Sequence, residues 1–183
     1  MNFFLLVLQP IWFFFPAALA NIAASVSKKI PFFNVPIDLN NTFQGQPLFG
    51  NHKTYRGMVF GVVVGIFTFY IQQVLYQYQF IQEISLFDYH NSTSAVGFGL
   101  GFGAIFGDLI KSFFKRRKGI ASGRSWFPFD QTDWILGAAL LTIPFVKFQV
   151  PVLFIIISIV LGFLFHLIFK RLGYWVGIEN SAV

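Results

Sequence analysis

The chain has 183 residues, of which 56% are hydrophobic and only 11% are charged. A soluble domain carries about a quarter charged residues, so this composition excludes a soluble globular protein and indicates one membrane domain over residues 1–183. The sequence has no cysteine, which excludes disulfides and thiolate chemistry, and its formal net charge of +6 favours anionic headgroups, phosphates or nucleotides as partners. Nucleic acid is not expected as a partner, because little of the chain lies outside the predicted bilayer.

The apolar runs predict the spans in chain order. A membrane-spanning helix needs about 20 predominantly apolar residues. We therefore expect an all-α integral membrane protein with about five transmembrane helices, at roughly 3–26, 57–78, 94–114, 131–147 and 150–170. The last two are expected to form a hairpin around Lys147 and Pro151. Cleavage of the first segment as a signal peptide is a weaker interpretation, because that segment lacks a basic n-region.

Lysine and arginine predict the orientation, since basic residues concentrate on the cytoplasmic side of a membrane. With five spans, Lys147 lies alone on one side. The other twelve basic residues share the opposite side: Lys28, Lys29, Lys53, Arg56, Lys111, Lys115, Arg116, Arg117, Lys118, Arg124, Lys170 and Arg171. We expect a multi-pass protein of the cell membrane with its N-terminus outside and two basic cytoplasmic loops. The sequence carries no pattern that indicates an oligomeric state.

The first loop contains a polar set near its end. Pro, Gly and Asn recur between the first two spans, so we expect an irregular loop that packs through its own apolar residues. Lys53, Thr54 and Arg56 lie at the predicted start of the second span, where an anion would be favoured by the helix N-terminus. A positive-inside anchor with a glycine turn is the alternative. Asn21, inside the first span, is expected either to bond another helix or to contact a ligand.

Two patterns mark the third span. Gly99, Gly103 and Gly107 are four residues apart and predict close helix packing, which is compatible with room for a ligand. The side chains that follow share one helix face by their spacing: Asp108, Lys111, Ser112 and Lys115. A carboxylate at this depth needs protein, water or another partner, so we favour a functional role for Asp108 over an internal pair with Lys111 or Ser112.

The third loop leads into two further carboxylates, Asp130 and Asp133, on the opening turn of the fourth span. A helix N-cap would explain Asp130 but not Asp133. Together with Asp108, these residues place three carboxylates at the ends of consecutive spans, among lysines and arginines. Carboxylates beside a basic cluster suit a magnesium–polyphosphate site.

Three tracts together resemble the CDP-archaeol synthases: PAALANIAASV, PLFGNHKTYRG and GDLIKSFFKRRKGIASGRSWFPFDQTDWILGA. Members of that family are integral membrane cytidylyltransferases, related to CDP-diacylglycerol synthases, that activate an archaeal lipid phosphate with CTP. The resemblance covers essentially the whole chain. A proline often follows the A-N patch in the family pattern, where this chain has Ser25 or Val26.

The resemblance implies CMP transfer from CTP to a lipid phosphate of the 2,3-bis-O-geranylgeranylglycerol 1-phosphate type, giving CDP-archaeol and pyrophosphate. It implies a cytoplasmic site in which Asp108, Asp130 and Asp133 hold Mg²⁺ and share the catalytic role with Lys111. Substrate phosphates and polar groups would be bound by Asn21, Lys53, Thr54, Arg56, Ser112, Lys115, Arg116 and Arg117. The lipid tails would occupy a groove between spans that is open to membrane lipids.

Two alternatives remain at this point. Within the enzyme class, the acceptor would be phosphatidic acid or another lipid phosphate; a CDP-alcohol phosphotransferase is disfavoured because its longer aspartate pattern is missing. In a second class, the chain would be a small transporter or an assembly subunit, and its acidic residues would line a path across the bilayer. The clustering of three carboxylates at one side favours the enzyme.

Overall fold

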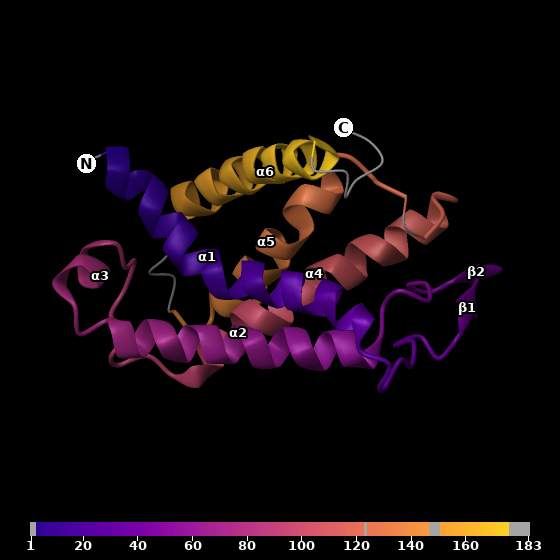
Figure 1. Cartoon of the computed structure of the whole chain (residues 1–183), viewed down its shortest axis with the longest axis horizontal. Helices are drawn as coiled ribbons and strands as arrows, with labels where there is room; N and C mark the ends of the chain where they lie inside the picture. Colours follow the sequence, from indigo (N-terminus) through magenta and orange to yellow (C-terminus); the bar gives the residue numbers. More distant parts are fainter. Residues whose placement is uncertain (1–2, 123, 147–150, 176–183) are drawn as a thin grey trace.

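The computed structural model describes residues 3–122, 124–146 and 151–175 and confirms the expected all-α membrane fold (Figure 1). The helices are α1 (Phe3–Val26), α2 (Tyr55–Leu75), α3 (Gln79–Glu83), α4 (Ser94–Arg117), α5 (Phe129–Thr142) and α6 (Val152–Trp175). A 3₁₀ turn, η1 (Ser27–Lys29), follows α1, and a hairpin of β1 (Thr42–Phe43) and β2 (Gln46–Pro47) lies in the first loop.

Three helices in the described part of the chain are long and apolar enough to cross a membrane: α1 with η1, α2 and α4. The 14-residue α5 is shorter, and the apolar part of α6 within that description is Val152–Leu164. The count of five spans and the orientation stay predictions. Lys147, which was expected alone on the outer side, lies outside the described residues.

The first helix continues through both of its prolines. Pro10 and Pro16 lie inside α1 and are both buried. Proline removes a backbone hydrogen bond, and membrane helices accommodate it where neighbouring helices cover the freed groups. The predicted span at 3–26 therefore matches one uninterrupted helix.

The central helix α4 contacts α2 and α5 through glycines on two of its faces. A Cβ added to Gly103 would lie 2.6 Å from Ala138 Cα, and one added to Gly107 would lie 2.1 Å from the carbonyl oxygen of Asp133. On another face, a Cβ on Gly101 would lie 3.1 Å from Gly65 Cα of α2. The predicted small-residue packing is confirmed, and it brings the start of α5 against the end of α4.

The two ends of the helix bundle differ in chemistry. Tyr89, after α3, is fully buried and stacks on Phe87 and Phe69 with ring centroids 4.4 and 5.4 Å apart. The β1–β2 hairpin lies at the opposite end, beside the C-terminal part of α4 (Figure 1). The ion pairs of Lys53, Lys111 and Lys115 with aspartates of α4 and α5 lie at that second end, which we therefore call the charged end.

Candidate active site

The charged end is built around Lys111, whose ammonium contacts three carboxylates. Its Nζ lies 2.9 Å from Asp108 Oδ1, 2.8 Å from Asp130 Oδ1 and 2.8 Å from Asp133 Oδ2. The predicted convergence of these carboxylates is therefore present, with a lysine at its centre. The internal Asp108–Lys111 pair that the spacing allowed is also present, as one contact of this larger cluster.

Two further lysines neutralise the same carboxylates. Lys53 of the first loop donates a hydrogen bond to Asp108 Oδ2, and Lys115 Nζ lies 3.2 Å from both oxygens of Asp130. Three acidic and three basic side chains thus form one alternating network at the ends of α4 and α5. Each carboxylate is mostly shielded from solvent, so removal of one cation would leave a poorly solvated negative charge.

The carboxylates suit a hard cation but do not form a ready-made metal site. Among the described residues, no group of three His, Cys, Asp or Glu side chains is arranged to hold a metal ion. The oxygens lie 2.8–2.9 Å from the ammonium, whereas magnesium requires about 2.1 Å. Asp133 Oδ2 is buried, and the Lys111 ammonium lies 2.8 Å from it. These donors fit a divalent cation that would take over the place of the Lys111 ammonium.

Asp130 is not the N-cap of α5, contrary to one interpretation of the sequence. The helix begins at Phe129 with Pro128 as its cap, and no side-chain cap is formed there. Instead Asp130 Oδ2 accepts a hydrogen bond from the backbone N–H of Trp126 at 2.5 Å. This bond orients the Asp130 carboxylate toward Lys111 and Lys115.

Thr54 has a structural position at the start of α2. Its hydroxyl oxygen accepts a hydrogen bond from the N–H of Gly57 at 3.2 Å, so Thr54 is the N-cap of that helix. Pro36 forms an isolated bridge with Thr54, which ties the beginning of the first loop to its end. Lys53 is thereby fixed directly before the helix.

Two arginines expected at phosphates instead contact loop backbone. The guanidinium of Arg56 donates to the carbonyls of Ile30 and Phe32 and to Asn34 Oδ1. The guanidinium of Arg117 donates to backbone carbonyls of the β1–β2 hairpin region. Both residues therefore organise the first loop.

The remaining predicted residues lie close to the network. Ser112 and Arg116 are buried on α4, and a Cβ built on Gly50 would lie 3.9 Å from Arg116 Cδ. Arg116 is thus packed under the loop that carries Lys53. Its buried Nε has no hydrogen-bond partner in the described structure.

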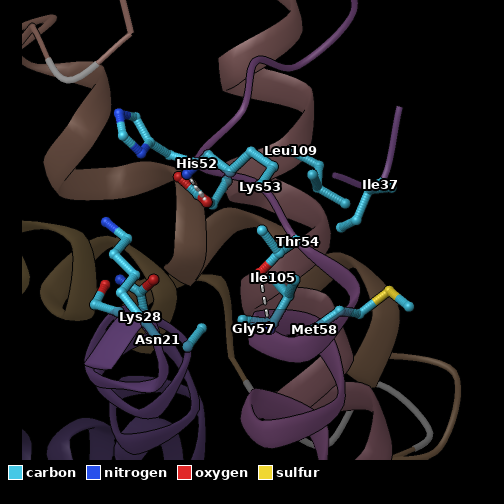
Figure 2. A pocket seen from close by; sticks show the side chains of 13 residues that line it. Asn21, Lys28, Ile37, His52, Lys53, Thr54, Gly57, Met58, Ile105 and Leu109 are labelled. Carbon is cyan, nitrogen blue, oxygen red and sulfur yellow. Dashed lines mark hydrogen bonds and ion pairs between the residues drawn. The ribbon is translucent and has the colours of Figure 1, made fainter. Parts of the chain in front are cut away.

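A polar cleft opens beside the carboxylate network, between α1, α2, α4 and the first loop. It encloses about 390 Å³ including its open mouth. In Figure 2, Asn21 and Lys28 lie on one side of the cleft and His52 and Lys53 on the other. Its polar lining is Asn21, Ser25, Lys28, His52, Lys53, Thr54 and Asp108. Lys28 and His52 were not among the expected site residues, because neither stands in a distinctive local pattern.

An apolar groove adjoins the polar cleft. Its empty space is about 1160 Å³, including the space at its open side, between α1, α5 and α6, with Phe14, Ala18, Trp134 and Leu161 among its lining. Asn21 lines both the groove and the cleft, so the two spaces meet at its side chain. The arrangement offers a charged site next to a channel for hydrocarbon.

Comparison with known proteins shows the family to which this chain belongs. The family model for CarS-like CDP-archaeol synthases matches residues 3–182. A CDP-archaeol synthase of Methanocaldococcus jannaschii is 31% identical over 97% of this chain and 98% of the relative, and one of Methanoregula boonei is 36% identical over 80% and 88%. The solved structure of an intramembrane enzyme for archaeal membrane lipids biosynthesis superposes with a TM-score of 0.67 and 25% identity, over 88% of this chain and 92% of that one. The chain therefore belongs to the CDP-archaeol synthase family.

Proposed function

We propose that the charged network and the adjoining cleft are the site at which this chain transfers CMP from CTP to a lipid phosphate of the 2,3-bis-O-geranylgeranylglycerol 1-phosphate type. The chain is a membrane enzyme of lipid biosynthesis, a CTP-dependent cytidylyltransferase that forms CDP-archaeol. The observation that carries the assignment of the site is the convergence of Asp108, Asp130 and Asp133 on one cation position beside a cleft that meets an apolar groove.

The reaction needs no general base. A phosphate monoester has a second pKa of about 6, so the acceptor is already anionic near neutral pH. Its oxygen forms a bond to the α-phosphorus of CTP, while the bond from that phosphorus to the bridging oxygen breaks and pyrophosphate leaves with the electron pair. The protein must hold two anions together in line and neutralise their charge.

Cationic side chains supply that neutralisation. Lys53, Lys111 and Lys115 are part of the network, Arg116 is buried next to Lys115 on α4, and Lys28 lines the cleft. Phosphate oxygens entering the cleft would compete with the carboxylates for Lys53 and Lys111. This change of partners is favourable if a divalent cation binds the carboxylates that Lys53 and Lys111 release, because no buried charge is then left unpaired.

Mg²⁺ is the divalent cation we propose, with Asp108, Asp130 and Asp133 as its protein ligands. Bound there, it would offset the negative charge of the triphosphate. The donor set consists of carboxylate oxygens, and this supports Mg²⁺ over a softer metal. Ser112 is placed on the same face of α4 and is proposed to contact a substrate oxygen.

The lipid substrate is proposed to span the two spaces that meet at Asn21. Its tails would lie in the groove along Ala18 and Leu161, and its phosphate would reach the cleft beside Lys53. The amide of Asn21 then lies where the glycerol must pass from hydrocarbon to charge. With the basic end in the cytoplasm of the cell, as the positive-inside pattern predicts, the site would receive cytoplasmic CTP.

The test is a reconstituted assay with purified protein, labelled CTP, MgCl₂ and a panel of lipid phosphates that includes phosphatidic acid. We expect CDP-lipid and pyrophosphate, with the isoprenoid ether phosphate as the best acceptor. Absence of product with every acceptor would refute the activity, and preference for phosphatidic acid would refute the acceptor assignment.

A variant of Asp133 tests the assignment of the metal ligands and of the site. Asp133→Asn should lower turnover about 100-fold or more while the protein remains inserted and folded, since it removes a charge on which the site depends. Asp88→Asn, in the loop between α3 and α4, is the matched control and should retain turnover, because Asp88 accepts a hydrogen bond from the N–H of His90 within that loop. Normal turnover in Asp133→Asn would remove Asp133 from the site.

A further inference from the structure

Arg117, at the last turn of α4, fastens the β1–β2 hairpin to that helix. Its Nη1 donates to the carbonyl of Pro47 at 2.9 Å and to that of Leu48 at 3.3 Å, and its Nη2 donates to the carbonyl of Phe43 at 3.1 Å. The guanidinium carbon also lies 4.2 Å from the ring centroid of Phe113 and 5.3 Å from that of Phe43. One side chain thus bonds both strands of the hairpin and stacks between two rings.

The hairpin is connected to Lys53 through a second set of contacts. Asp38 accepts hydrogen bonds from the N–H groups of Phe49 and Gly50, both at 3.0 Å, directly after the segment that Arg117 holds. The carbonyl of Gly50 in turn accepts from the N–H of Lys53 at 3.0 Å. Only a short stretch of chain separates Pro47 from Lys53, and these bonds hold that stretch, so the position of the hairpin constrains the backbone that presents Lys53 to Asp108.

We propose that Arg117 is a positioning residue for the reaction, which holds the first loop against α4 and so keeps Lys53 at the active site without touching substrate. The inference rests on the proposed function. It assigns to Arg117 a role different from the phosphate binding that the family resemblance implied. The cleft lining contains Lys53 and His52 from the loop but not Arg117, which agrees with an indirect role.

The chemistry of the contacts requires arginine. A planar guanidinium donates to several carbonyls at once and stacks on aromatic faces, whereas a lysine ammonium is a compact point charge. Lysine at this position would keep the charge but would lose the simultaneous bonds to Phe43 and Pro47. A phosphate contact, by contrast, tolerates a point charge.

This difference defines the first experiment. Arg117→Ala and Arg117→Lys should both lower kcat/KM by about 10- to 100-fold, because small displacements of catalytic groups are costly. Lys118→Ala removes the same charge from the next residue and should retain activity within about twofold; Lys118 contacts Trp126, not the hairpin. Near-normal activity of Arg117→Lys would overturn the proposal, since it would show that charge alone suffices.

The second experiment replaces the contacts of Arg117 with the hairpin by a covalent link between the hairpin and α4. The sequence has no cysteine, so Phe43→Cys and Phe113→Cys, whose rings lie 6.2 Å apart, can be joined selectively by a short bismaleimide. In the Arg117→Ala background, the link should restore kcat/KM to within about threefold of the same linked protein that retains Arg117. A linked protein that stays as impaired as the unlinked Arg117→Ala variant would show direct action on substrate and overturn the proposal.

A readout that does not depend on activity separates this proposal from the proposed function. Hydrogen exchange of the amides of Phe49 and Gly50 should accelerate at least tenfold in Arg117→Ala and remain slow in Lys118→Ala. Unchanged exchange of these amides in Arg117→Ala would show that Arg117 does not hold the loop, and it would overturn the proposal even if the enzyme were active. A wild-type protein that makes no CDP-lipid would instead refute the proposed function, while the exchange result would still report on the hairpin.

Discussion

Lys53 of the first loop is paired with Asp108 of α4, which lies 55 residues later in the chain. Asp108 is also bound by Lys111, 2.9 Å away on the same helix. One carboxylate therefore joins the loop that lines the cleft to the helix that carries the charged network. This shared contact makes the loop a structural part of the active site.

The Lys53–Asp108 pair predicts energetic coupling between loop and helix. In a double-mutant cycle of Lys53→Met and Asp108→Asn, we expect a coupling energy of about 0.5–3 kcal/mol, because residues in one ion-pair network do not contribute additively. Chemical unfolding in detergent would measure it. Lys29→Met combined with Asp108→Asn is the control, since Lys29 is an exposed cation outside the network. Additive effects in the Lys53 cycle would argue against the coupling.

The close approach of α4 and α5 predicts a steric effect at Gly107. Gly107→Ala would place a methyl group 2.1 Å from the Asp133 carbonyl oxygen, so α5 must shift. Overpacking of this kind costs about 1–3 kcal/mol. We expect lower thermal stability in detergent and reduced turnover, because Asp133 moves with the helix. Leu140→Ala, on the exposed face of α5, should change stability by less than about 0.5 kcal/mol. Wild-type behaviour of Gly107→Ala would contradict this packing.

The hydrogen bonds accepted by Asp38 predict that the stability of the first loop depends on pH. Burial disfavours its charged form, but hydrogen bonds from the N–H groups of Phe49, Gly50 and Asn40 outweigh this effect and lower the pKa of Asp38 below its usual value. A pKa lowered by folding gives stability that is present above the unfolded pKa of about 3.9 and is lost as the pH falls through the folded value.

The Asp38 effect is measured by exchange of the loop amides, corrected for intrinsic rates, at pH 6 and below pH 4. Wild-type protection should fall in the acidic window. Asp38→Asn should be less protected already at pH 6 and should show a smaller further change on acidification. Equal acid sensitivity of both proteins would exclude Asp38 as the titrating group.

The apolar groove predicts a selective effect on the lipid substrate. Ala18→Trp should fill part of the groove and raise the KM for the lipid phosphate about tenfold, while the KM for CTP changes less than about twofold. Phe67→Trp, on the exposed face of α2, adds bulk outside the groove and is the control. A rise in the KM for CTP instead would place the nucleotide, rather than the tails, in this space.

Local sequence predicted much of the helical architecture, because long apolar runs and small-residue spacing act through the nearest helix turns. The predicted span at 3–26 is α1, and the glycines at 99, 103 and 107 do face α5. The span at 131–147 was expected to extend past the end of α5 at Thr142. The hairpin at Thr42–Pro47 was not predicted, because turn and loop residues do not follow a helical period.

The sequence by itself determined that Asp108, Lys111 and Lys115 share one face of a membrane helix, since that follows from 3.6 residues per turn. Only the tertiary structure decided that Asp130 and Asp133 meet Asp108 around Lys111, because the approach of α5 depends on backbone contact at Gly107. It also decided that Arg117 binds the carbonyl of Pro47, 70 residues away, where the family resemblance had implied a phosphate. The sequence around a basic residue does not show whether its partner is a substrate or a distant backbone carbonyl. The partner depends on which groups the fold brings next to the side chain.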